Sequence, residues 1–314
     1  MITRRDLILH VIIGFFAVLT LVPFLFTLNN AWRTNAEMFR SFFGLPESLT
    51  QMVEAKRAQW AGVDAQFEVE TDEGEVITVG AAEACGYLWR TATRGFRRSW
   101  VELRRYMINT FVTCGITACG VVFIGSMTAY ILSRYRFFGS KTLFYYIIAV
   151  MMFPGVLTLV PSFLLVKNLG LLNTYLAMIL PYIAGGQVFA IFVFKGFFDG
   201  LPEDLFESAR IDGAGHIQLY LNIILPLSKP ILSVVTIMNV LSTWNNFLWP
   251  FIVNTDRKYD VVASGLYVLA TSAFANSYST LFSAYMLSAI PLLVLFTYAT
   301  RPFIQGVTSG AFKA

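Results

Sequence analysis

Long apolar runs that contain no charged residue constrain this chain more than any other feature. Six such runs, each of about 20 residues or more, occupy positions 7–28, 108–132, 143–166, 175–194, 231–253 and 281–300. A helix crosses a hydrocarbon core of about 30 Å with about 20 residues. The runs therefore predict an all-α integral membrane protein with six transmembrane helices.

The composition agrees with a membrane protein and excludes several other classes. Only 13% of the residues are charged and 56% are hydrophobic, whereas about a quarter of an average soluble chain is charged. The net charge of +4 arises without a long basic run, which argues against nucleic acid as a partner. Cys85, Cys114 and Cys119 form no CxxC pair, so we expect neither a disulfide framework nor a metal site.

Basic residues in the short loops set the expected orientation. Arg134, Arg136 and Lys141 follow the second run with no acidic residue among them, so this loop is expected in the cytoplasm. An even number of helices then places both termini in the cytoplasm. Residues 1–29 are expected to form a retained anchor helix, because the first run is longer than the apolar part of a cleavable signal. Four arginines on the expected outer side oppose this orientation, at the end of a long connection that the charge rule constrains weakly: Arg97, Arg98, Arg104 and Arg105.

The connection at 30–107 is polar and far longer than a turn requires, which predicts a small mixed α/β insert outside the membrane. Residues 66–71 alternate between apolar and acidic side chains, and Asp72, Glu73 and Gly74 offer a turn before 76–79. This pattern predicts a β-hairpin. Residues 51–60 and 81–90 are expected to be helical. The rest of the chain, 108–314, is expected to be the membrane core.

A second long connection, at 199–226, is expected in the cytoplasm as a bent pair of short helices. Pro202 with two following acidic residues is typical of a helix start. Gly213 and Gly215 are expected to break the helix, and Asp212 is expected to cap the second one. Pro226 and Pro230 then redirect the chain into the fifth transmembrane run.

This connection carries a spaced motif. It contains the run Glu207-Ser208-Ala209-Arg210-Ile211-Asp212-Gly213-Ala214, followed after eight residues by Ile223-Ile224-Leu225-Pro226. The run closely resembles the EAA loop of ABC-importer permeases, whose pattern is E-A-A, three residues, G, nine residues and I-x-L-P. Ser208 stands where the pattern has an alanine, and as a small residue it still fits.

Two further segments resemble the carbohydrate-uptake permeases, and the nearest likeness in kind is the six-span subunit of the maltose-transporter type. They are 243–250, Thr-Trp-Asn-Asn-Phe-Leu-Trp-Pro, and 306–313, Gly-Val-Thr-Ser-Gly-Ala-Phe-Lys. The resemblance covers the chain from about Asn109 to its end, together with the first run, and does not extend to the insert from about Leu45 to Arg98.

The resemblance implies a subunit of an importer in the bacterial cytoplasmic (inner) membrane. Its expected partners are a second, related permease, two ATP-binding subunits, an extracytoplasmic solute-binding protein and membrane lipid. It also implies that the loop transmits motion from the ATPases, with these residues in contact: Glu207, Ser208, Ala209, Arg210, Asp212, Gly213 and Ala214. Glu207 and Arg210 lie three apart on one helical face and are expected to pair with each other or with the ATPase.

The residues themselves indicate that a partner subunit supplies the energy for transport. Ion-coupled carriers usually place ionisable groups within the membrane, and the six runs contain only His10, near the inner end of the first. The chain also contains no G-x-x-x-x-G-K-[ST] phosphate loop. We therefore expect no cofactor on this chain, with ATP and Mg²⁺ bound by the partner ATPase, and no enzymatic activity of its own.

One polar stripe lies within the fifth run. Asn239, Ser242, Thr243 and Asn246 recur at helical spacing, and such groups cannot face lipid cheaply. They are candidates for the path of a sugar, whose hydroxyl groups require hydrogen bonds. The alternative is hydrogen bonding to the partner permease.

Three alternatives to a sugar importer stay open. A secondary carrier or channel would share the six helices. An ABC importer for another solute, such as a glycerol phosphate, would share the loop. A membrane enzyme is disfavoured because no HExxH motif and no carboxylate pair lies within a run.

Overall fold

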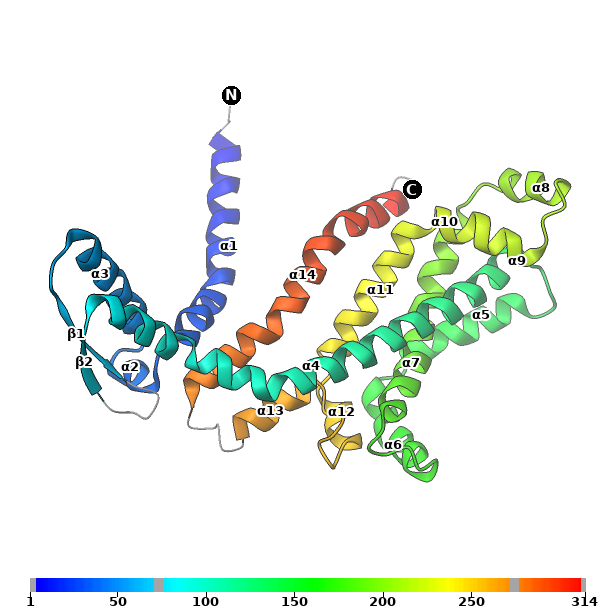
Figure 1. Ribbon diagram of the computed structural model, residues 1–314. Coiled ribbons are helices and arrows are strands. Elements are labelled where there is room, and N and C mark those ends of the chain that lie inside the picture. Colours follow the sequence, from blue (N-terminus) through cyan, green and yellow to red (C-terminus); the bar gives the residue numbers. More distant parts are fainter. Residues whose placement is uncertain (1–3, 71–75, 272–276, 312–314) are drawn as a thin grey trace. The chain divides into compact units, whose positions relative to one another are not determined.

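The structure is a computed structural model that describes residues 4–70, 76–271 and 277–311 (Figure 1). It divides into two compact units, one of Met1–Arg105 with Gly265–Ile290 and one of Tyr106–Ser264 with Pro291–Ala314. Within the described residues, four helices are long and apolar enough to cross a membrane, or six if each of two bent helix pairs counts as one crossing. The expected turn at Asp72, Glu73 and Gly74 lies outside the described residues, as do Phe312 and Lys313 of the C-terminal motif.

The first unit begins with α1 (Arg4–Ala31). Its apolar side chains are exposed around its whole circumference, for example Ile13 at 66% and Phe15 at 63%, as befits a helix whose solvent is lipid. After α1 the chain turns into α2 (Asn35–Arg40). The turn is held by Arg33, which is only 2% exposed and donates to the Asn30 side chain and to the Glu37 carbonyl oxygen.

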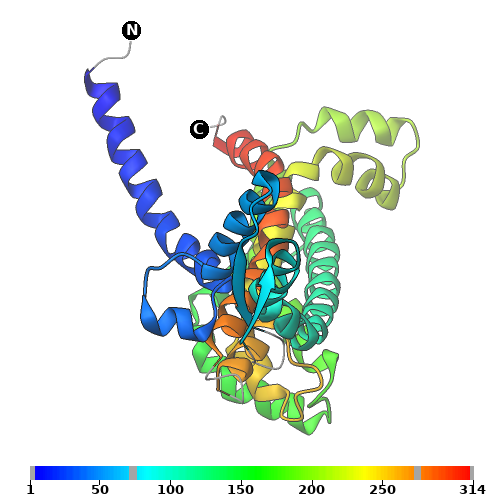
Figure 2. The ribbon, with the colours of Figure 1, turned by 60° about the vertical axis from the view of Figure 1, so that its left-hand side comes forward.

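The insert has a small core of its own. Helix α3 (Glu47–Ala61) precedes an antiparallel hairpin of β1 (Gln66–Glu70) and β2 (Val76–Gly80). The sheet lies against α3 and the start of α4, and Figure 2 brings this side forward. Val69 is buried with Ala55 of α3 and Ala84 and Leu88 of α4. The predicted hairpin and the helix predicted at 51–60 are therefore confirmed.

The second helix is much longer than its apolar run. Helix α4 covers Ala81–Arg134, 54 residues without a break, so the helix expected to begin at 108 in fact begins at Ala81. Helix propagation needs no apolar side chains, and the polar first half of α4 belongs to the first unit. The helix predicted at 81–90 is the beginning of α4.

Two apolar runs that were expected to be single helices are broken. The third run forms α5 (Ser140–Ala149), η1 (Val150–Met152), η2 (Gly155–Thr158) and α6 (Leu159–Asn168), with a bend of 93°. Phe153 is extended at the bend, with φ −82° and ψ 124°, because a following proline disfavours helical geometry. The fifth run forms α11 (Lys229–Trp244) and α12 (Leu248–Val253). Pro250 cannot accommodate the carbonyl group four residues earlier within a helix, so the helix breaks before α12.

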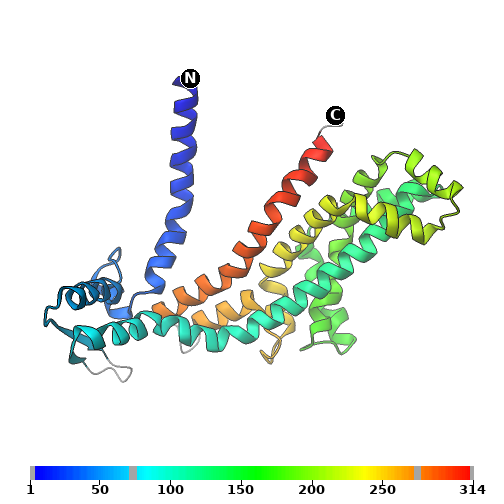
Figure 3. The ribbon, with the colours of Figure 1, turned by 45° about the horizontal axis from the view of Figure 1, so that its top comes forward.

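The remaining elements complete the two units. They are α7 (Tyr175–Asp199), α8 (Asp204–Ile211), α9 (His216–Leu219), the π-helical segment η3 (Tyr220–Ile224), α10 (Leu225–Leu227), α13 (Val262–Thr271) and α14 (Tyr278–Ala311). In the second unit α8 and α9 lie at the end opposite to α6 and α12 (Figures 1 and 3).

Glycines let α4 and α7 approach closely in the second unit. A Cβ atom on Gly125 would lie 2.9 Å from the Ala190 Cβ atom, and one on Gly186 would lie 2.7 Å from a Val121 methyl group. Small residues at such contacts are typical of packed membrane helices. The resulting core includes Val121, Ala190 and Phe194, all at most 1% exposed.

Candidate functional site

Gly213 creates the reversal between α8 and α9. Its φ of +83° is left-handed, a conformation that glycine adopts without the steric cost paid by other residues. The Gly213 N–H donates to the Arg210 carbonyl oxygen at 3.0 Å, and the Ala214 N–H donates to that of Ala209 at 2.9 Å. These bonds satisfy carbonyl groups at the end of α8, so the predicted break at Gly213 is confirmed.

The predicted loop residues separate into an exposed face and a packed face. Ala209 and Ala214 are half-buried against the core of the second unit, where Phe206 and Leu219 are each 1% exposed. The other members of the motif are exposed: Glu207, Ser208, Arg210, Asp212 and Gly213. The loop thus presents polar side chains outward while its small residues allow close packing inward.

Two finer expectations for this loop concern the pairing of Glu207 with Arg210 and the capping role of Asp212. None of the ion pairs among the described residues joins Glu207 to Arg210, so pairing with the ATPase stays a prediction. Asp212 does not cap α9, because the reversal at Gly213 makes Gly215 the extended residue that precedes the helix. The Gly215 N–H is instead satisfied by Gln218 Oε1 at 2.8 Å. A Gln three residues after a cap position is a sequence signal for this arrangement.

The loop is fastened to the end of α4. The Arg134 guanidinium lies 4.0 Å from the centre of the Phe206 ring and donates to the Leu201 carbonyl oxygen at 3.0 Å. Phe206, which sequence reasoning did not single out, is therefore the side chain that anchors α8.

The polar stripe lines a cleft in the same unit. Asn239, Ser242, Thr243 and Asn246 all border a cleft of about 590 Å³ between α11 and α7. Asn246 is not on the helix, because α11 ends at Trp244, and its Oδ1 accepts from the Trp249 N–H at 3.2 Å at the start of α12. The structure thus brings together the four residues that helical spacing grouped, three of them on α11.

Two residues that border the cleft each carry a polar atom without a hydrogen-bond partner among the described residues, Tyr182 Oη and Asn239 Oδ1. Both are buried, and such atoms are costly unless something satisfies them. Within the described ranges, the lining contains no charged side chain. Sequence reasoning missed Tyr182, although a phenol in the middle of an apolar run is a recognisable signal.

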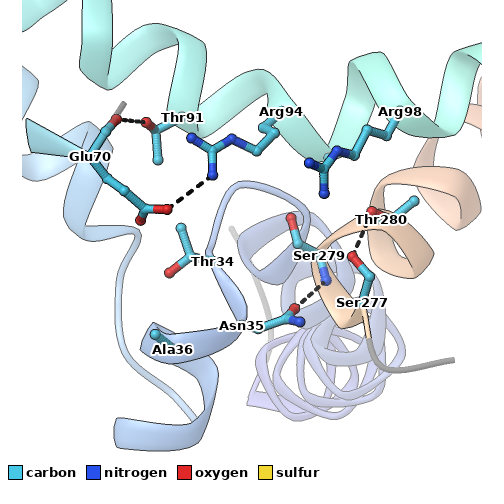
Figure 4. A pocket seen from close by; sticks show the side chains of 11 residues that line it. Thr34, Asn35, Ala36, Glu70, Thr91, Arg94, Arg98, Ser277, Ser279 and Thr280 are labelled. Atoms are coloured by element: carbon cyan, nitrogen blue, oxygen red, sulfur yellow. Dashed lines mark hydrogen bonds and ion pairs between the residues drawn. The ribbon is translucent and has the colours of Figure 1, made fainter. Parts of the chain in front are cut away.

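A second polar pocket, of about 230 Å³, lies in the first unit (Figure 4). Arg94 reaches across it to Glu70 at 3.1 Å, and Asn35 Oδ1 accepts from the Ser279 N–H at 3.2 Å. These contacts tie β1 to α4 and α2 to α14. Arg98, one of the four arginines noted before the second apolar run, also borders this pocket.

Comparison with known families identifies the class of protein. Residues 121–309 match the family described as binding-protein-dependent transport system inner membrane component. The match includes more than half of the chain. The chain belongs to this family. This permease is accordingly a multi-pass protein of the inner membrane, and the resemblance that rested on the loop motif is confirmed.

Curated relatives carry names that refer to the uptake of saccharides or of glycerol phosphate. The diacetylchitobiose uptake system permease protein NgcG of Streptomyces coelicolor is 28% identical over 313 residues, 99% of this permease and 90% of the relative. The arabinooligosaccharides transport system permease protein AraQ of Bacillus subtilis is 34% identical over 209 residues, 67% and 73% of the two chains. The sn-glycerol-3-phosphate transport system permease protein UgpE of Yersinia pestis is 30% identical over 202 residues, 64% and 71% of the two chains.

The similarity also extends over the insert, which corrects the expectation that it stops there. The match to NgcG includes 99% of this permease. A chain of a bacterial ABC transporter involved in the import of the acidic polysaccharide alginate has the same fold, with a TM-score of 0.72 at 19% identity over 96% of this permease and 99% of that chain. The motifs could not reveal this because they all lie outside the insert.

Proposed function

We propose that this permease is one membrane subunit of an ATP-driven importer for a sugar or oligosaccharide. The observation that carries the proposal is the loop α8–α9, which exposes the motif residues at one end of the second unit while Phe206 fixes it to the core. The complex would contain a second, related permease, two ATP-binding subunits and an extracytoplasmic solute-binding protein.

The exposed face of the loop fits a protein partner. Ile211 is 85% exposed and Ile217 is 69% exposed, and a protein interface buries apolar side chains at its centre with polar ones around them. Glu207 and Arg210 flank them with charges that a partner can match. We assign this face to the ATPase, which would bind ATP and Mg²⁺ itself.

The orientation follows from contacts within the second unit. Tyr135, just after α4, contacts His216 of α9, so the basic loop with Arg134, Arg136 and Lys141 lies on the same side as α8–α9. Basic short loops face the cytoplasm. This supports cytoplasmic termini and an extracytoplasmic insert.

The cleft supports a neutral, hydroxyl-rich solute. Its amides and hydroxyls offer hydrogen bonds, and its lining in the described ranges carries no cation to balance a phosphate or carboxylate. The names of NgcG and AraQ agree with a sugar. A glycerol phosphate, as in the name of UgpE, is the alternative solute.

Gly213→Val tests the loop assignment. Valine strongly disfavours the left-handed φ of +83° at Gly213, by about 1–2 kcal/mol. We expect the ATPase recovered with a tagged permease to fall about tenfold at equal membrane content. Gly62→Val is the matched control, because Gly62 has φ +65° and equally open surroundings in the insert.

The two variants distinguish the outcomes. Loss of ATPase in Gly213→Val alone supports the proposal, whereas equal recovery in both variants contradicts it. A secondary carrier would instead show solute flux driven by an ion gradient in vesicles that contain this permease alone.

A further inference from the structure

A chain of hydroxyl groups joins the end of α4 to the first residue of α9. The Tyr130 hydroxyl donates to the His216 carbonyl oxygen at 3.2 Å and lies 2.9 Å from the Tyr135 hydroxyl. The Tyr135 hydroxyl lies 2.5 Å from His216 Nδ1. The backbone and the ring of His216 are therefore both held by residues at the end of α4.

Helix α4 also contacts Tyr220, the residue that follows α9, deeper in the core. The Tyr220 hydroxyl lies 2.7 Å from Ser126 Oγ, and its ring lies 5.6 Å from that of Tyr130. Tyr220 is 4% exposed and begins the π-helical segment η3. Such segments are rare and frequently occur at functional sites.

These contacts give α9 two different faces. Leu219 of α9 is 1% exposed and the following Tyr220 is 4% exposed, whereas Ile217 of α9 is 69% exposed. The packed face is hydrogen-bonded to α4 and the open face is the one assigned to the ATPase. Closely packed interiors transmit displacement because they cannot deform continuously.

We propose that Tyr130, Tyr135 and His216 are positioning residues that make α9 and the inner end of α4 move as one body, so that motion of the ATPase reaches the membrane helices. This inference rests on the proposed function, because it requires an ATPase on the open face. Arg134 with Phe206 would hold α8 in the same way.

Tyr135→Phe tests the proposal, because it removes the hydroxyl that meets His216 and keeps the aromatic ring. The readout is the accessibility of the cleft, reported by Ser242→Cys, since Ser242 is exposed and lines the cleft. The purified complex, with its copurifying partners, is reconstituted in vesicles and treated with a membrane-impermeant maleimide, with and without ATP and vanadate. A parent lacking the new cysteine gives the background from Cys85, Cys114 and Cys119.

We expect ATP to change the labelling rate in the complex that carries only Ser242→Cys. In Tyr135→Phe this change should shrink about fivefold, the equilibrium effect of one net hydrogen bond, while ATP hydrolysis stays within about twofold. Tyr87→Phe, which removes the same hydroxyl from a tyrosine of the insert, should behave like the parent. Adding His216→Asn to Tyr135→Phe should cause a smaller loss than the two single changes summed, because both remove the contact between the Tyr135 hydroxyl and the imidazole.

The outcomes separate this proposal from the one on which it rests. If ATP is not hydrolysed, or does not change labelling in the parent complex, the proposed function fails. If the parent responds and Tyr135→Phe responds equally, or loses hydrolysis and labelling change in the same proportion, the positioning role alone is overturned.

Discussion

Asn239 is the residue whose side chain most directly tests whether the cleft meets solute. Its Oδ1 is buried without a partner among the described residues, and Asn239 borders the cleft. If Asn239 had only a structural role, an apolar replacement would stabilise the protein, because a buried oxygen without a hydrogen bond is costly.

Asn239→Leu should therefore raise the half-saturating solute concentration for uptake about fivefold without loss of thermal stability, because one hydrogen bond to solute is lost. Asn245→Leu is the matched control. Asn245 is exposed, and its side-chain amide donates to the Leu241 carbonyl oxygen one turn earlier, at 2.8 Å. Unchanged uptake with a more stable protein would mean that Asn239 does not touch solute.

At the residue scale, the sequence predicted which residues share a helical face better than it predicted which residues of other helices lie near them. Helical periodicity grouped Asn239, Ser242 and Thr243, because a helix fixes which residues share a face. It could not add Tyr182, which comes from another helix and reaches the cleft only through packing. It misplaced Asp212, because the choice of cap depends on where the left-handed turn falls.

At the scale of the elements, only one of two adjacent glycines in α7 lies at the close contact with α4. A side chain on Gly186 would meet Val121 at 2.7 Å and the Asn239 amide nitrogen at 3.0 Å, whereas one on Gly185 would meet nothing within 4 Å. Both glycines border the cleft.

Gly186→Val should destabilise the protein by about 1–3 kcal/mol, because it forces packed helices apart. This would appear as a lower unfolding temperature in detergent. Gly185→Val should leave the unfolding temperature close to that of the parent. Equal unfolding temperatures for the two variants would contradict the packing described here.

The apolar runs predicted that the helices exist but not where they bend or begin. Hydropathy measures how favourably a segment transfers into lipid and carries no information on backbone geometry. It therefore did not predict the breaks before Pro154 and Pro250, although proline itself is a signal for a break. It equally missed the polar half of α4, which is helical from Ala81 but lies outside the apolar run.

At the scale of the whole molecule, the insert and the loop after α4 are proposed to lie on opposite sides of the membrane. Trp60 of α3 is 86% exposed, and Phe138 is exposed in the basic loop that follows α4. Cysteines at these two positions report the two sides independently.

In intact spheroplasts, an impermeant maleimide should label Trp60→Cys above the background of the parent chain. Phe138→Cys should be labelled only after permeabilisation, because basic short loops face the cytoplasm. Labelling of Phe138→Cys in intact spheroplasts would reverse the orientation.

The division into an anchor at 1–29, an insert at 30–107 and a core at 108–314 stays a prediction, with the loop at 199–226 as the part proposed to meet the ATPase. Family membership could be predicted from the sequence by the motif from Glu207 to Pro226, which lies within the matched residues 121–309. The solute does not follow from it, because permeases with sugar and glycerol phosphate names are similar to the same chain.

The central claim is that this permease is driven by a separate ATPase. The most direct test is to tag the chain, extract it gently from its own membrane and quantify by mass spectrometry the proteins that copurify in stoichiometric amount. We predict an ATPase with a G-x-x-x-x-G-K-[ST] loop and a second permease of the same family. Recovery of this chain alone, active in vesicles without ATP, would contradict the account.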